Sequence, residues 1–172
     1  MASGTLRLIL FIAVVGACSA ALNPSWGEGG DTAALAAAIK DATATLQGGL
    51  KASEREGAPI SAKFEIEDGK LQLSVYTMKG DSFMEVIADP KTGAIAKTEK
   101  ITDDEDLKAA TSQKAAMTKA KVTLAAATDA AASANVGFRA VSIYPQLQNG
   151  RPMAEVTLLQ GTTFKKVTEK LE

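Results

Sequence analysis

The chain has 172 residues, a formal net charge of −1 and charges of both signs along its length. This balance argues against a nucleic-acid partner, because phosphate recognition needs a concentrated basic surface. Histidine is absent, which removes Ser-His and Cys-His catalysis and histidine-ligated zinc sites. The sequence also lacks a Gly-rich phosphate loop, so we expect a protein that is not an enzyme and that carries no cofactor.

Residues 1–21 have the composition of an export signal. Arg7 supplies one positive charge, Leu8 to Val15 form an apolar run, and small residues follow this run. The run is about half as long as a transmembrane helix needs to be. We therefore expect an exported bacterial protein of the periplasm or the cell envelope.

Cys18 is the single cysteine of the chain and a candidate for lipidation. The preceding Val15-Gly16-Ala17 resembles a bacterial lipobox, in which the signal ends at Ala17 and the cysteine becomes a lipid-modified N-terminus. The usual lipobox has Leu where this chain has Val15, and ordinary cleavage after Ala20 or Ala21 would remove Cys18. Both alternatives stay open, and membrane contact is expected only through such an anchor. Residues 22–31 would form a flexible tether.

Residues 32–101 are expected to form a first unit of helices and strands. An Ala-rich helical pattern opens the unit, and helical character resumes through Leu50. Two adjacent glycines, Gly48 and Gly49, lie inside this second stretch at a cost of about 1 kcal/mol each relative to Ala. They predict close packing of the helix on a sheet, with a kink as the alternative.

From Ile60 onward the apolar residues alternate with polar ones, which predicts a strand with one wet face. Asp68-Gly69 is a strong hairpin signal, since both central positions of that turn need positive φ. Further strands are expected at 71–77 and 83–88. A fourth strand at 94–100 would form an edge of the sheet.

Residues 102–172 are expected to form a second unit. Thr102 as N-cap and Glu105 three positions later form a capping box, which predicts a helix as far as about Lys121. A further helix is expected at 124–134. Strands should follow at 138–147, 153–160 and 163–171, with a hairpin turn at Asn149-Gly150.

The two units repeat each other at an offset of 81 residues (150 − 69). Asp68-Gly69-Lys70 recurs as Asn149-Gly150-Arg151, and Phe83 recurs as Phe164. A period this long indicates two copies of one supersecondary unit. The expected class is α+β, with two tandem repeats that each pack an Ala-rich helical segment on a three- to four-stranded antiparallel sheet. Each repeat is near the lower size limit for a stable core, so the halves should support one another.

The order of these motifs resembles the PepSY domain: an Ala-rich helix, an amphipathic strand, a Gly hairpin, a strand, Gly-x-x-Phe, and a strand that closes on Asp-Pro-x-Thr-Gly at 89–93. The second copy ends before any such turn, so its fourth strand is missing. The resemblance implies a small exported protein with an interaction role, such as peptidase inhibition or ligand binding. It supplies no catalytic residues.

The densest acidic cluster of the chain contains Asp103, Asp104 and Asp106. These carboxylates are weak candidates for a hard cation such as Ca²⁺. Acids in the first turn of a helix favour the positive end of its dipole, and we prefer this interpretation because it also explains Thr102. The sequence therefore predicts a non-enzymatic extracytoplasmic module that binds a protein or peptide. The alternative is a periplasmic metal-binding protein.

Overall fold

The computed structural model describes residues 30–172, and the expected export signal, Cys18 and most of the tether lie outside this part. Within it, helices and strands follow in this order: α1 Gly30–Ile39, α2 Leu46–Ser53, β1 Ala58–Glu67, β2 Lys70–Lys79, β3 Ser82–Ala88, β4 Ile95–Lys100, α3 Asp104–Met117, α4 Leu124–Ala134, β5 Arg139–Gln148, β6 Arg151–Gln160 and β7 Thr163–Lys170. The mixed helix and strand class expected from the sequence is confirmed.

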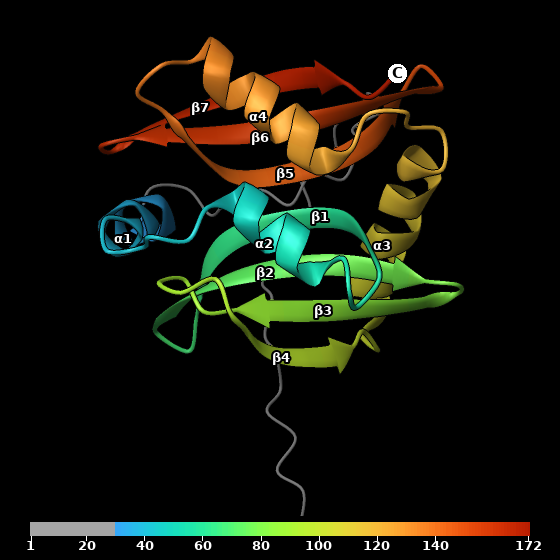
Figure 1. The fold of residues 1–172 in the computed structure, drawn as a ribbon, viewed down its shortest axis with the longest axis horizontal. Helices are drawn as coiled ribbons and strands as arrows, with labels where there is room; N and C mark the ends of the chain where they lie inside the picture. The colour runs from blue at the N-terminus through green and yellow to red at the C-terminus, as the bar shows by residue number, and fades with distance from the viewer. Residues whose placement is uncertain (1–29) are drawn as a thin grey trace, which may run out of the picture.

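The strands form one seven-stranded antiparallel sheet in the order β4-β3-β2-β1-β5-β6-β7 (Figure 1). The two halves of the sheet meet where β1 pairs with β5, with Ala62 opposite Ile143 and Lys63 opposite Ser142. The sequence left open whether each half forms its own sheet. In the structure the halves share one sheet, and β4 and β7 are its edges.

One face of the sheet is covered by α1, α2 and α4. The helices α2 and α4 contact each other and run across β1 and β5 in Figure 1. Between helices and sheet lies the main core, built by Leu35, Ile39, Leu46, Leu50, Phe64, Leu73, Val75, Ile143, Val156 and Leu158, among others. All of these side chains are buried, so this face supplies most of the apolar burial that stabilises the fold.

The opposite face of the sheet receives α3. Successive residues of a strand point to opposite faces, so Tyr76 points away from the core that contains Val75. Tyr76 packs near Leu107 and Ala110 of α3, in a second and smaller cluster. Figure 1 shows α3 away from α2 and α4, in the link that leads from the β4 edge to α4.

The two hairpins have matching turns. Asp68 and Asn149 have φ of 50° and 52°, and the glycines that follow them, Gly69 and Gly150, have φ of 74° and 77°. These are the left-handed values that the Asp-Gly and Asn-Gly signals predict. Both hairpins also carry a register shift near their start, between residues 59 and 61 in β1 and between residues 140 and 142 in β5.

The start of α3 differs from the expectation by one residue. Asp103, not Thr102, is the N-cap, and its carboxylate accepts hydrogen bonds from the backbone N–H groups of Glu105 and Asp106 at 2.9 and 3.2 Å. The helix also ends at Met117, earlier than expected. The acidic cluster is therefore the first turn of a capped helix, as the preferred interpretation of the sequence had it.

Close packing explains the second of the paired glycines. A Cβ added at Gly49 would lie 2.4 Å from Cδ2 of Leu73 on β2, whereas one at Gly48 would meet only Oγ1 of Thr45, at 3.1 Å. The helix α2 thus approaches the sheet at Gly49 more closely than any side chain would permit.

Candidate functional site

The face of the sheet opposite α2 and α4 carries most of the chemically distinctive side chains. We call it the polar face. Alternation places these residues there because their strand neighbours, such as Ala62, Phe64 and Val75, are buried in the main core. Its central members are Lys63, Glu65 and Glu67 of β1, Gln72, Ser74 and Tyr76 of β2, Glu85 of β3, Tyr144 of β5 and Glu155 of β6.

An ion pair lies at the centre of the polar face. Nζ of Lys63 is 2.5 Å from Oε2 of Glu65, and the two side chains are only 30% and 17% exposed. Burial raises the pKa of Glu65, but Lys63 and the hydrogen bonds from Ser74 and Gln72 lower it further, so the net pKa is low. Burial lowers the pKa of Lys63, while Tyr144, Glu65 and Glu85 raise it overall. Both groups are therefore charged at neutral pH.

Gln72 links several members of the face. Its Nε2 donates to Oε1 of Glu65 at 3.2 Å, to Oε2 of Glu67 at 2.9 Å and to Oγ of Ser74 at 3.0 Å. One amide thus orients two carboxylates from the neighbouring strand. The acidic groups are held in place before any partner arrives, which reduces the ordering cost of binding.

Three carboxylates converge on this face. One oxygen from each of Glu65, Glu67 and Glu85 lies within 4.8 Å of the other two, and Glu85 is 5% exposed. Within residues 30–172 this is the one acidic set close enough to share a cation. Oxygen ligands of this type suit hard cations, and also the ammonium or guanidinium group of a partner.

The residues that the sequence proposed for a metal do not form such a set. Asp103 is committed to capping α3, Asp104 is exposed in the first turn, and Asp106 interacts with the hydroxyl of Tyr76. Sequence reasoning placed Glu65 and Glu67 on a wet strand face but did not bring Glu85 to them. The signal was the turn at Gly80-Asp81, whose register sets Tyr76 opposite Glu85.

Two tyrosines frame the carboxylates. Burial raises the pKa of Tyr144 to about 12, and burial together with Asp106 and Glu85 raises the pKa of Tyr76. Both phenols therefore keep their protons at neutral pH and act as neutral hydrogen-bonding groups. The polar face offers fixed acids and neutral hydroxyls.

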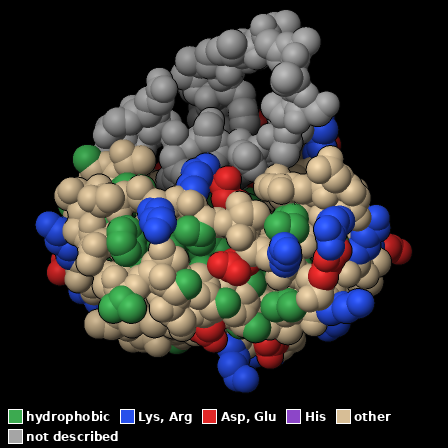
Figure 2. Space-filling model, turned by 90° about the horizontal axis from the view of Figure 1, so that it is seen from above, with side chains coloured by type: hydrophobic (Ala, Val, Ile, Leu, Met, Phe, Trp, Pro, Cys, Tyr) green, Lys and Arg blue, Asp and Glu red, His purple; other side chains and the backbone are tan. Residues whose placement is uncertain are grey.

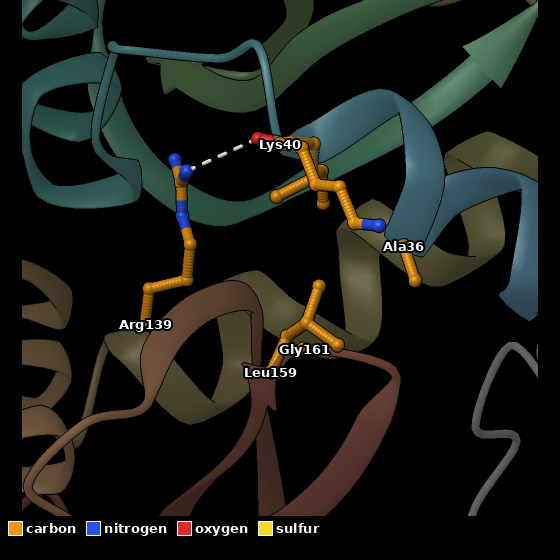
Figure 3. A pocket seen from close by; sticks show the side chains of 6 residues that line it. Ala36, Lys40, Arg139, Leu159 and Gly161 are labelled. Carbon is orange, nitrogen blue, oxygen red and sulfur yellow. Dashed lines mark hydrogen bonds between the residues drawn. The ribbon is translucent and has the colours of Figure 1, made fainter.

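A hollow of about 110 Å³ at the other face is built around Arg139 (Figure 3). The guanidinium donates to the carbonyls of Ile39, Ala42 and Ala44 at 3.3, 2.9 and 2.8 Å, and it lies 5.4 Å from the centre of the Phe64 ring. Figure 3 shows the side chain reaching from its strand to the end of α1. Arg139 thus fastens the connection between α1 and α2 to the sheet, which is a structural role.

The edges of the sheet are charged. β4 is the expected fourth strand, and it carries the ion pair Lys97–Glu99 at 2.8 Å. β7 carries Lys165, Lys166, Glu169 and Lys170. Figure 2, which looks onto the side of α4 and β7, shows basic, acidic and hydrophobic side chains intermingled. Lysines on edge strands discourage unspecific strand pairing.

No protein-family model matches this chain, and no curated protein matches it. Among solved structures, it is similar to a crystal structure from Clostridium difficile 630 described as a "putative lipoprotein", with 15% sequence identity and a TM-score of 0.39. The similarity covers 71% of this chain and 80% of that one, and it indicates nothing about activity or partner. Within the described residues, each helix is too short or too polar to cross a membrane.

Proposed function

We propose that this protein is a non-enzymatic extracytoplasmic binding module that takes a basic segment of another protein or a peptide on its polar face. The observation that carries the proposal is the preorganised acidic set of that face. Glu65, Glu67, Glu85 and Glu155 outnumber the lysines that accompany them, Lys63 and Lys166. Complementary charge is what selects partners and speeds their encounter.

Labelled peptides test this proposal. A fluorescent hexapeptide rich in Lys and Arg should bind the purified protein, and binding should weaken as salt rises, because exposed charges are screened. A matched peptide rich in Glu should not bind. The double variant Glu65→Gln/Glu85→Gln should bind the basic peptide at least tenfold more weakly.

The matched control changes the same charge elsewhere. Asp104→Asn/Glu105→Gln removes two carboxylates from the exposed first turn of α3 and should leave peptide binding unchanged. Equal losses in the two double variants would mean that net charge alone attracts the peptide, and the proposed site would then be wrong. Absence of binding at about 1 mM protein would also reject it, since that is the weak limit of specific affinity.

The resemblance to the PepSY domain extends the proposal to peptidases as partners. Pull-down from a periplasmic extract, followed by inhibition assays on any recovered peptidase, tests this extension. The proposal also includes export, with the chain lying in the periplasm or anchored to the cell envelope through Cys18. Intact mass of the exported protein distinguishes lipid attachment from cleavage that removes Cys18.

We further propose that the two halves are tandem copies of one ancestral unit. β1 and β5 begin 81 residues apart (139 − 58), and β2 and β6 begin at the same offset (151 − 70). The matching turns and the matching register shifts support this origin. On this proposal, residues 32–101 and 102–172 are the copies, and the second lacks a counterpart of β4.

A hard cation is the second candidate ligand, because Glu65, Glu67 and Glu85 can reach one ion. Tyr76 interacts electrostatically with Glu85 and Glu65, so it lies near enough to sensitise the luminescence of bound Tb³⁺. Titration with Tb³⁺ and calorimetry with Ca²⁺ decide the matter. Saturable signals that disappear in Glu65→Gln/Glu85→Gln would favour a metal, and no saturable heat at millimolar Ca²⁺ would exclude it.

A further inference from the structure

The edge strand β4 has a defined set of backbone groups on its outer side. Among the described strands β4 pairs only with β3. The backbone N–H of Ile101 donates to the carbonyl of Phe83 at 3.0 Å. In an antiparallel pair, residues alternate between facing the partner strand and facing away from it. Lys97 and Glu99 therefore direct their backbone groups at β3, and Thr98 and Lys100 direct theirs outward.

This alternation restricts how two copies of β4 can pair with each other. A two-fold symmetric antiparallel pair must be centred on one residue that faces its own copy. Centring on Lys97 would set two lysines opposite each other, and centring on Glu99 would set two glutamates opposite each other. Like charges directly opposite are destabilising.

Centring on Thr98 gives the opposite result. Lys97 of each copy then faces Glu99 of the other, twice, and the two Thr98 residues exchange backbone hydrogen bonds. Lys97 and Glu99 already form an ion pair within one chain and are 57% and 42% exposed. The charges of β4 thus disfavour the neighbouring registers and favour one.

The other edge is less suited to such pairing. Two copies of β7 would bring six lysines together with two glutamates, since each strand carries Lys165, Lys166, Lys170 and Glu169. One strand of β4 has two lysines and one glutamate. Pairing of strand edges is also how the halves of this chain meet, at Ala62 and Ile143.

We propose that two copies of this protein associate through β4, antiparallel and centred on Thr98, to form a continuous sheet across the dimer. A register shift between Ile87 and Ala88 places a bulge near Ala96, which limits the regular contact to a few residues. A contact this small is weak, so we expect a dissociation constant of about 0.1 to 1 mM.

Sedimentation equilibrium of the purified protein tests the dimer. Lys97→Glu and Glu99→Lys should each weaken association at least tenfold, because each sets like charges opposite each other. The charge-swapped double variant Lys97→Glu/Glu99→Lys should restore it. The control Lys165→Glu on β7 should leave association unchanged.

Thr98→Pro provides a second readout. Proline removes one outward N–H donor, and an edge position tolerates this without loss of the monomer fold. Circular dichroism should therefore stay unchanged while association disappears. A wild-type protein that remains monomeric at about 1 mM, or a dimer that survives both Thr98→Pro and the single charge reversals, would overturn the proposal.

Discussion

Ala62 and Ile143 face each other across the β1–β5 pair, and they are also 81 positions apart in the chain (143 − 62). Since 81 is the offset at which the sequence repeats, each residue occupies the same place in its own half. The neighbouring pair, Lys63 with Ser142, fits the same two-fold arrangement. The centre of the sheet therefore lies on an approximate two-fold axis, around which each half completes the sheet of the other.

The packing of α2 gives a first prediction. Gly49→Ala should destabilise the fold by about 1–3 kcal/mol, because the new Cβ would overlap Leu73 in the core. Helix propensity alone predicts the opposite sign, a gain of about 1 kcal/mol. Urea denaturation measures the difference, with Gly48→Ala as the control whose Cβ meets only the Thr45 hydroxyl. If Gly49→Ala is as stable as Gly48→Ala, the close approach of α2 is wrong.

The corrected start of α3 gives a second prediction. Asp103→Ala should cost about 1 kcal/mol of stability, since its carboxylate satisfies two backbone N–H groups at the helix start. Thr102→Ala should cost much less, because Thr102 lies outside the helix and is exposed. Thermal unfolding of both variants checks this order. The reverse order would restore the capping box that the sequence suggested.

Arg139 gives a third prediction. Arg139→Lys keeps the charge but cannot reach three carbonyls with a planar fork, so the link between α1 and α2 should loosen. We expect a loss of about 2 kcal/mol, a value typical of hydrogen bonds to charged groups, and faster hydrogen exchange in residues 40–45. Arg151→Lys is the control, because Arg151 binds only the exposed Glu172. Equal effects of the two substitutions would contradict the assigned role.

Local chemistry explains which parts of the fold could be predicted from the sequence. Both hairpins could be predicted, because Asp68-Gly69 and Asn149-Gly150 determine a turn within two residues and the period of two determines the buried face. The cap of α3 was missed by one position, since Thr102 and Asp103 are both good caps and the docking of Leu107 and Ala110 on the sheet decides between them.

Long-range pairing explains what could not be predicted. The junction of β1 with β5 joins strands about 80 residues apart, and no local pattern in either strand specifies it. The same holds for the candidate site. Glu65 and Glu85 belong to strands that are not neighbours, so their approach depends on the register of two successive hairpins rather than on a motif.

The Lys63–Glu65 ion pair makes stability depend on pH in a defined direction. The pKa of Glu65 is lowered in the folded state, so its stabilising effect is complete above its unfolded pKa of about 4.3 and is lost as pH falls through the lower folded value. Glu65→Gln should therefore be less stable than wild type at pH 7, and the gap should close toward pH 2.5. Lys63, whose pKa is raised, loses its contribution only in strong alkali and does not affect this range. Urea midpoints measured from pH 2.5 to 7 test the slope, with the exposed Glu54→Gln as control. A gap between wild type and Glu65→Gln that is constant with pH would show that Glu65 contributes packing alone and that its charge is not stabilised by Lys63.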